Sequence, residues 1–350
     1  MRHHTRQNLR TAGQTESKRK PSQPDLNSGP QPSSKDPQSG TGRAPLPHAT
    51  SERASRDASR YRKLEQRIRD GAGQGHLDDY VPMWRITRAN ITRFGSQMTG
   101  PLPGYRRGSH FRARSHLEMA LLALWIGALD VRENYPLWLF DHPHPLTGWP
   151  DDRVERRPCR GLLELFDGKR RASNLIRQAL GGAIPDVTLM VTFGDPTHPR
   201  CMLVECLGAE AFDGTKLPLL DYSERYASAN DIRYMASVPE HVGHTFMANL
   251  VACSYAVNAV RRDMSPSLLA ASEASLRRDL EHNTFLGAVA ATSIRLKVDE
   301  RNLWTVVHYM KWRQTIDVDL RQPVYHSERP IPGGQALRSA LQKIIFGQTP

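Results

Sequence analysis

The chain has 350 residues, which is enough length for two domains. Its formal net charge of +12 favours a polyanionic partner, with nucleic acid as the first candidate. Its four cysteines form no CxxC pair and no secreted disulfide framework, so a reducing cytoplasm is expected. No apolar run is long enough to span a membrane, and the N-terminus lacks the apolar core of a signal peptide, which argues against membrane and secreted classes.

The first 70 residues carry most of the charge. They hold fifteen Lys or Arg against seven Asp or Glu, which is +8 of the total +12. The segment is rich in Ser, Pro, Gln and Gly and poor in apolar residues, so burial cannot offset the entropy of ordering it. We therefore predict a disordered basic arm over residues 1–75, with a short helix possible at residues 58–70.

Ordered structure is predicted from about residue 80. The stretch from Gly104 to Arg114 interleaves five basic side chains with Tyr105 and Phe111. This pattern suits a phosphate-contacting surface, and an ordinary basic loop is the equal alternative.

A helix is predicted to start at Ser115. Ser115 and Glu118 have the spacing of a capping box, in which Glu118 would point back to the helix start. Glu118 also lies at helical spacing from the apolar face, so the alternative is an acid directed into the core. The apolar face comprises Leu117, Leu121, Leu122, Trp125 and Leu129.

A strand is predicted over residues 131–140, followed by a polar, Pro-rich insertion at residues 142–160. His142 and His144 in this insertion are interpreted as loop residues rather than metal ligands. A helix is predicted from residue 162 to residue 180, ending at a Gly pair.

The centre of the chain is a predicted hairpin from Ile184 to Leu207, with two apolar runs around a Gly-Asp-Pro turn. Asp186 opens the first strand and Glu205 lies late in the second, so the hairpin would place the two acids near each other. A carboxylate in an apolar strand is costly unless it is paired or bound to a cation. The pair therefore suits a Mg²⁺ site, and the alternative is a strand-end cap and a solvated edge.

The remaining pattern completes an α/β core and adds helices. A helix at 219–229, a strand at 231–239 and a helix at 242–262 complete the predicted core, residues 80–262. Residues 265–328 have the pattern of three helices followed by a strand at Ile316–Leu320, which suggests a winged-helix domain. Residues 329–350 are predicted to form a tail.

Four short motifs, in this order, resemble the TnsA endonuclease of heteromeric cut-and-paste transposases: Ser115-His116-Leu117-Glu118, Val131 to Leu137, Pro185-Asp186, and Leu203-Val204-Glu205-Cys206-Leu207. The resemblance covers roughly residues 85–325. It implies a PD-(D/E)xK restriction-endonuclease-like core and a C-terminal winged helix. It also implies that Glu118, Asp186 and Glu205, with the Cys206 carbonyl, hold Mg²⁺ or Mn²⁺.

The chain departs from the family at two positions. Leu207 stands where the family has its catalytic Lys, and Asn134 replaces a strand Gln. Lys216 is the first candidate to supply the missing charge, and Lys169 is the second. If one of them does, the chain is an endonuclease that cuts the 5′ strands of transposon ends.

Two other hypotheses stay open. The first is an inactive assembly subunit of the same fold. The second is an unrelated winged-helix regulator. For the endonuclease, the resemblance implies double-stranded DNA, an integrase-type transposase and an AAA+ ATPase regulator as partners.

Overall fold

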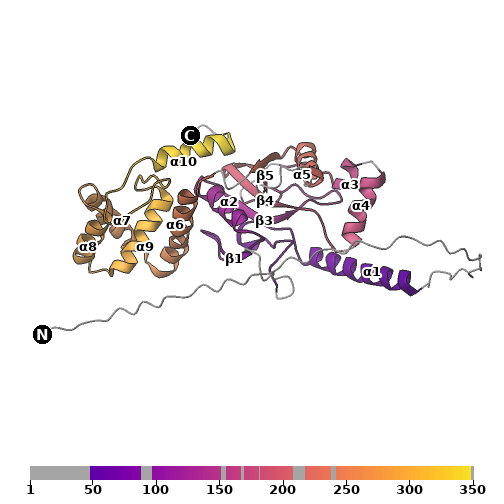
Figure 1. Cartoon of the computed structure of the whole chain (residues 1–350), viewed down its shortest axis with the longest axis horizontal. Coiled ribbons are helices and arrows are strands. Elements are labelled where there is room, and N and C mark those ends of the chain that lie inside the picture. Colours follow the sequence, from indigo (N-terminus) through magenta and orange to yellow (C-terminus); the bar gives the residue numbers. More distant parts are fainter. Residues whose placement is uncertain are drawn as a thin grey trace, which may run out of the picture. The chain divides into compact units, whose positions relative to one another are not determined.

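The computed structural model describes residues 48–87, 97–150, 155–166, 169–180, 182–207, 217–237 and 242–347. The chain from His48 onward groups into one compact unit of mixed α/β structure (Figure 1). The disorder predicted for residues 1–47 lies outside the described residues. Among the described helices, none is long and apolar enough to cross a membrane.

Residues 48–75 of the predicted disordered arm are folded, and the short helix expected at residues 58–70 is part of a longer helix. Helix α1 spans His48–Arg69, and its last turns bury Leu64 and partly bury Ile68. These two residues, four apart, pack with Met83, Trp138 and Ile184. Two apolar residues on one helix face therefore anchor a stretch whose composition indicates disorder.

The central sheet has the strand order β3-β4-β5-β6. Its first three strands are antiparallel, and β5 and β6 are parallel. The predicted hairpin is confirmed, with Asp195 opposite His198 across the two-residue turn. The four strands are β3 Asp130–Pro136, β4 Asp186–Asp195, β5 His198–Cys206 and β6 Arg233–Ser237.

Helices cover both faces of this sheet. Leu189 and Val204 enter one hydrophobic cluster, whereas Met190 and Leu203 enter another, as expected from the alternation of side chains along a strand. The first cluster contains residues of α2 Arg114–Trp125 and α6 His244–Asp263. The second contains residues of α3 Leu162–Leu165, α4 Lys169–Leu180 and α5 Leu217–Ala229.

A small second sheet is attached to β3 by buried charges. It pairs β1 Met98–Pro101 with β2 Gly108–Phe111, and the short 3₁₀ helix η1 Leu77–Asp79 lies near it. The Arg107 guanidinium donates to Glu133 at 2.8 Å and to the Val131 carbonyl at 2.9 Å. These contacts fix the start of the basic stretch against the central sheet.

The C-terminal helices are α7 Pro266–Leu280, α8 Phe285–Leu296, α9 Glu300–Arg313 and α10 Gly334–Phe346. The first three were expected, and Ser265, Thr284 and Asp299 cap them with side-chain oxygens. Figure 1 shows α6 to α9 packed together. One hydrophobic cluster includes both the sheet and these helices, so it runs across the predicted boundary at residues 262–265.

The predicted strand at Ile316–Leu320 is wrong, because these residues pair with no strand. Their apolar side chains are buried in the main cluster. Asp317 accepts a hydrogen bond from the Gln335 amide, and Asp319 binds Arg321. The apolar residues of this alternating pattern thus pack in the main cluster, and no wing is present in the described part of the C-terminal region.

Candidate active site

A cavity of about 850 Å³ opens where the β4–β5 hairpin meets α4, α5 and the start of α2. Asp186, Thr188 and Glu205 line it from the sheet. Other lining residues include Arg112 and His116 from the other side, and Tyr222 of α5. The cavity therefore gathers the two predicted strand acids with a cation and a histidine.

The strand register brings the two acids together. The pairing of β4 with β5 ends at Leu189 opposite Val204, and Thr188 and Glu205 are the next residues beyond this pair. The Thr188 hydroxyl donates to Glu205 Oε1 at 3.3 Å and accepts from the Cys206 amide at 3.1 Å. Thr188 thus holds one carboxylate oxygen of Glu205 in place.

The second oxygen of Glu205, Oε2, is buried and has no hydrogen-bond partner among the described residues. Glu205 is only 6% exposed. Burial raises its pKa to about 7; the hydrogen bond from Thr188 opposes this rise, and the Asp186 charge adds to it. A free carboxylate oxygen beside a second carboxylate is a donor set that suits a hard divalent cation.

Arg112 neutralises Asp186 in this structure. Its two terminal nitrogens contact the two carboxylate oxygens of Asp186, one of them at 2.9 Å. The guanidinium also lies 5.0 Å from the centre of the Trp84 ring. Burial raises the pKa of Asp186, against the opposing effect of Arg112. Sequence reasoning placed Arg112 in the basic stretch but not at this carboxylate.

His116 also lines the cavity and is neutral at pH 7. Burial, with the nearby Arg112 charge, lowers its pKa to about 4. Asn134 lines the same cavity in a left-handed backbone conformation with φ of 50°, and its amide donates to the His110 carbonyl at 2.6 Å. A left-handed residue inside a strand is strained, and such strain gathers at functional sites.

Glu118 is not among the residues that line the cavity. The capping box is absent, because Ala113 is the N-cap and makes no side-chain cap. Glu118 instead binds the Arg114 Nε at 2.7 Å. No group of three His, Cys, Asp or Glu side chains in the described ranges is arranged to hold a metal ion. Asp186 and Glu205 are therefore the acids that the structure brings together.

Position 207, where the TnsA resemblance predicts a catalytic Lys, is apolar. Leu207 is buried against Leu220 of α5, and its amide donates to the Ser237 carbonyl at 2.8 Å. Lys216 lies outside the described residues, and so does the side chain of Lys169. Cys206 lines the cavity beside Glu205.

Comparison of the sequence with models of protein families and with curated proteins finds no match. The geometry of the cavity therefore carries the functional argument.

Proposed function

We propose that this chain is a Mg²⁺- or Mn²⁺-dependent DNA endonuclease of the TnsA type, which cuts the 5′ strands at transposon ends. The observation that carries the proposal is the free, buried Oε2 of Glu205 in the cavity that Asp186 also lines. A divalent cation bound there would offset the desolvation of the carboxylate. Mg²⁺ in nucleic-acid enzymes is held by one or two carboxylates and by phosphate oxygens, so two acids suffice.

The bound cation would supply a water of lowered pKa and neutralise charge on the phosphate. The chain's own residues orient this chemistry. Thr188 fixes one Glu205 oxygen and leaves the other free. His116, neutral at pH 7, can donate or accept a hydrogen bond in the cavity without adding charge.

Arg112 is our candidate for the role of the missing Lys. Leu207 cannot stabilise negative charge on phosphate, and Arg112 lines the cavity with a guanidinium already placed at Asp186. A cation bound by Asp186 would displace Arg112 from the carboxylate. The freed guanidinium could then bind two phosphate oxygens, since its fork geometry matches phosphate.

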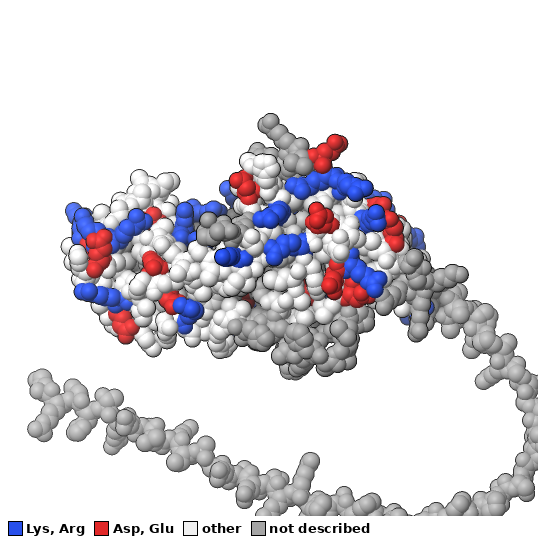
Figure 2. Space-filling model, turned by 90° about the horizontal axis from the view of Figure 1, so that it is seen from above, with Lys and Arg blue, Asp and Glu red and all other residues white. Residues whose placement is uncertain are grey.

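Double-stranded DNA is the proposed substrate. The net charge of +12 favours a polyanion, although Figure 2 shows Lys and Arg interspersed with Asp and Glu on the face in view. An integrase-type transposase and an AAA+ ATPase regulator are the partners that this proposal implies.

The alternative is an assembly subunit without cleavage. Two observations favour it. Leu207 packs against the apolar side chain of Leu220, and Arg112 already forms an ion pair with Asp186. Under this alternative the fold binds DNA and partners, and the acids are structural.

A nicking assay on transposon-end DNA with Mg²⁺ or Mn²⁺ and the co-encoded partner proteins tests the proposal. We expect nicks with the natural chain, loss of nicks with Asp186→Asn, and retention with Asp263→Asn, whose carboxylate is exposed and bound to Arg262. DNA binding by the natural chain without any nicks would favour the assembly subunit. If the chain cuts the 5′ strands in cells, Asp186→Ala should shift the transposition products from simple insertions to cointegrates.

A further inference from the structure

A second cavity, of about 530 Å³, lies on the other side of Ile184, which lines both cavities. Its walls come from α1, the segment Gly73–His76, β3 and the loop Trp138–Thr147. Helix α1 supplies one wall of this cavity, so the cavity depends on the folding of α1. The cavity was not predicted from the sequence. Nothing in the proposed endonuclease uses it.

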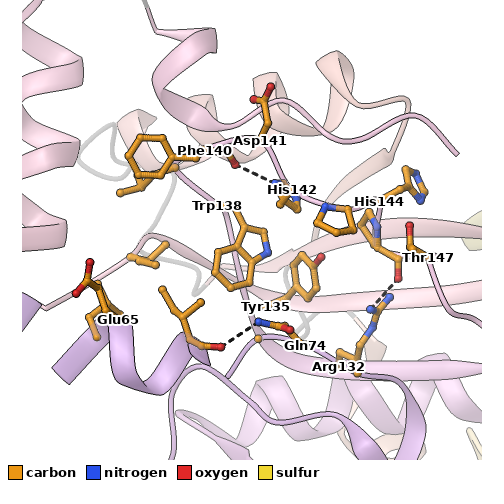
Figure 3. Close-up of a pocket in the computed structure, with 18 of the residues that line it drawn as sticks. Glu65, Gln74, Arg132, Tyr135, Trp138, Phe140, Asp141, His142, His144 and Thr147 are labelled. Atoms are coloured by element: carbon orange, nitrogen blue, oxygen red, sulfur yellow. Dashed lines mark hydrogen bonds between the residues drawn. The ribbon is translucent and has the colours of Figure 1, made fainter. Parts of the chain in front are cut away.

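Aromatic rings make up much of the wall. Among the described residues, the rings that line the cavity belong to Tyr61, His76, Tyr135, Trp138, Phe140, His142 and His144. In Figure 3 the indole of Trp138 lies at the centre of the view, with Phe140 and Asp141 above it and Glu65 below and to one side. Phe140 is 68% exposed, so its ring is accessible at the cavity.

The charges at this cavity are negative. Glu65 is half-buried and forms no ion pair with any described residue. Asp141 is exposed and accepts one hydrogen bond, from the Gly161 amide at 3.0 Å. Burial lowers the pKa of His76 and of His142, so neither histidine adds positive charge at pH 7.

The positive charge of Arg132 does not make the cavity a site for anions. It is 2% exposed, and its guanidinium donates to the Pro145 carbonyl at 3.0 Å. Its Nε lies 3.4 Å from Asp130 Oδ2, and its central carbon lies 5.3 Å from the centre of the Tyr135 ring. Arg132, the arginine among the described residues that line the cavity, is therefore engaged with the protein and not offered to an anion.

From these observations we infer that the cavity binds an alkylated ammonium ion. Aromatic faces attract a cation through their negative quadrupoles, and methyl groups on the nitrogen reduce the cost of removing it from water. Glu65 and Asp141 add charge complementarity. An anion would meet two carboxylates, and a neutral apolar ligand would leave Glu65 without a partner. The inference stands independently of the endonuclease proposal.

The decisive probe is choline against its neutral isostere 3,3-dimethylbutan-1-ol, with binding to the full chain measured by ligand-detected NMR titration. Because the two probes share shape, a difference isolates the charge. We expect choline to bind about tenfold more tightly. Equal binding of both, or no binding of choline, would overturn the inference.

Two variants and a control locate the site. Glu65→Gln keeps the shape of the side chain and should weaken choline binding while leaving the isostere unchanged; Trp138→Leu should weaken choline binding too. Glu281→Gln, at an exposed acid far along the chain, should change neither. Unchanged choline affinity in Glu65→Gln, in a chain that still folds, would refute this location.

A third experiment distinguishes two sources of an alkylated ammonium ion: a methylated lysine side chain of a partner protein and a free small molecule. A peptide that carries trimethyllysine is compared with the same peptide carrying unmodified lysine. Binding of the methylated peptide above that of choline assigns the site to a partner's side chain, whereas weaker binding assigns it to a small molecule.

Discussion

Burial raises the pKa of the Glu205 carboxyl group from 4.5 to about 7, and this links folding to pH. Below pH 4.5 the group is protonated in both the folded and the unfolded chain. As the pH rises towards 7, the unfolded chain ionises first, so the folded state loses stability relative to it. The shift corresponds to a loss of about 3 kcal/mol.

We predict that Glu205→Gln removes this loss. The free energy of unfolding of the natural chain should fall between pH 4.5 and pH 7 by about 3 kcal/mol more than that of the variant. Urea unfolding at intervals of pH measures it. Glu281→Gln, at an exposed acid, should follow the natural chain. Parallel curves for the natural chain and Glu205→Gln would contradict the raised pKa.

Arg112 gives a second prediction at this scale. Since its guanidinium competes with a cation for Asp186, Arg112→Gln should raise the affinity for Mn²⁺, by about tenfold, and abolish nicking. The Mn²⁺ concentration that raises the melting temperature reports the affinity without requiring activity.

Arg262→Gln, which removes an exposed arginine paired with Asp263 outside the basic stretch, is the matched control and should change neither property. If Arg112→Gln left the Mn²⁺ affinity unchanged, Arg112 would not compete with the metal. If Arg112→Gln raised the Mn²⁺ affinity but the natural chain never nicked DNA, the competition between Arg112 and the metal would stand and the endonuclease proposal would be rejected.

Among the elements, β2 is held to β3 by side chains as well as by packing. The Arg107–Glu133 ion pair is buried, with the two side chains 8% and 1% exposed. Glu133 also accepts from the His110 amide at 3.1 Å. Since Arg112 follows β2 directly, this attachment positions the guanidinium over Asp186.

We predict that Arg107→Ala destabilises the chain by about 3–5 kcal/mol, because it leaves the Glu133 carboxylate buried without its cation. Chemical denaturation measures the change. Arg106→Ala, at the exposed neighbouring residue, should alter stability by less than about 0.5 kcal/mol. A small effect of Arg107→Ala would mean that Glu133 is neutral in the folded chain.

For the molecule as a whole, α10 closes the main hydrophobic cluster. Phe346 is buried, and its ring stacks on that of Phe193 in β4, with ring centres 4.7 Å apart. The last helix is thereby packed against the sheet that carries Asp186. The C-terminal region is thus expected to unfold together with the core.

We predict that Phe346→Ala lowers the free energy of unfolding by about 3–5 kcal/mol in a single transition. Ile344→Ala, two residues away on the same helix and 73% exposed, is the control and should have little effect. Two separate transitions in the natural chain would contradict a shared core.

The sequence by itself determined the hairpin, the order of helices and strands around it, and the proximity of Asp186 to Glu205. These features depend on local signals: β-rich runs, turn residues and the pairing that a short turn imposes. Local signals failed at Ile316–Leu320, where alternation reflects burial on helices rather than pairing in a sheet.

Only the tertiary structure showed that α1 is folded, that Arg112 is the partner of Asp186 and that α10 packs against the sheet. Arg112 and Asp186 are 74 residues apart, and Phe193 and Phe346 are 153 residues apart. Leu64 and Ile68 stabilise α1 only because Met83, Trp138 and Ile184 provide a surface for them. Such contacts join distant segments, and composition and periodicity describe only neighbouring residues, so the chemistry of the candidate site emerged from folding.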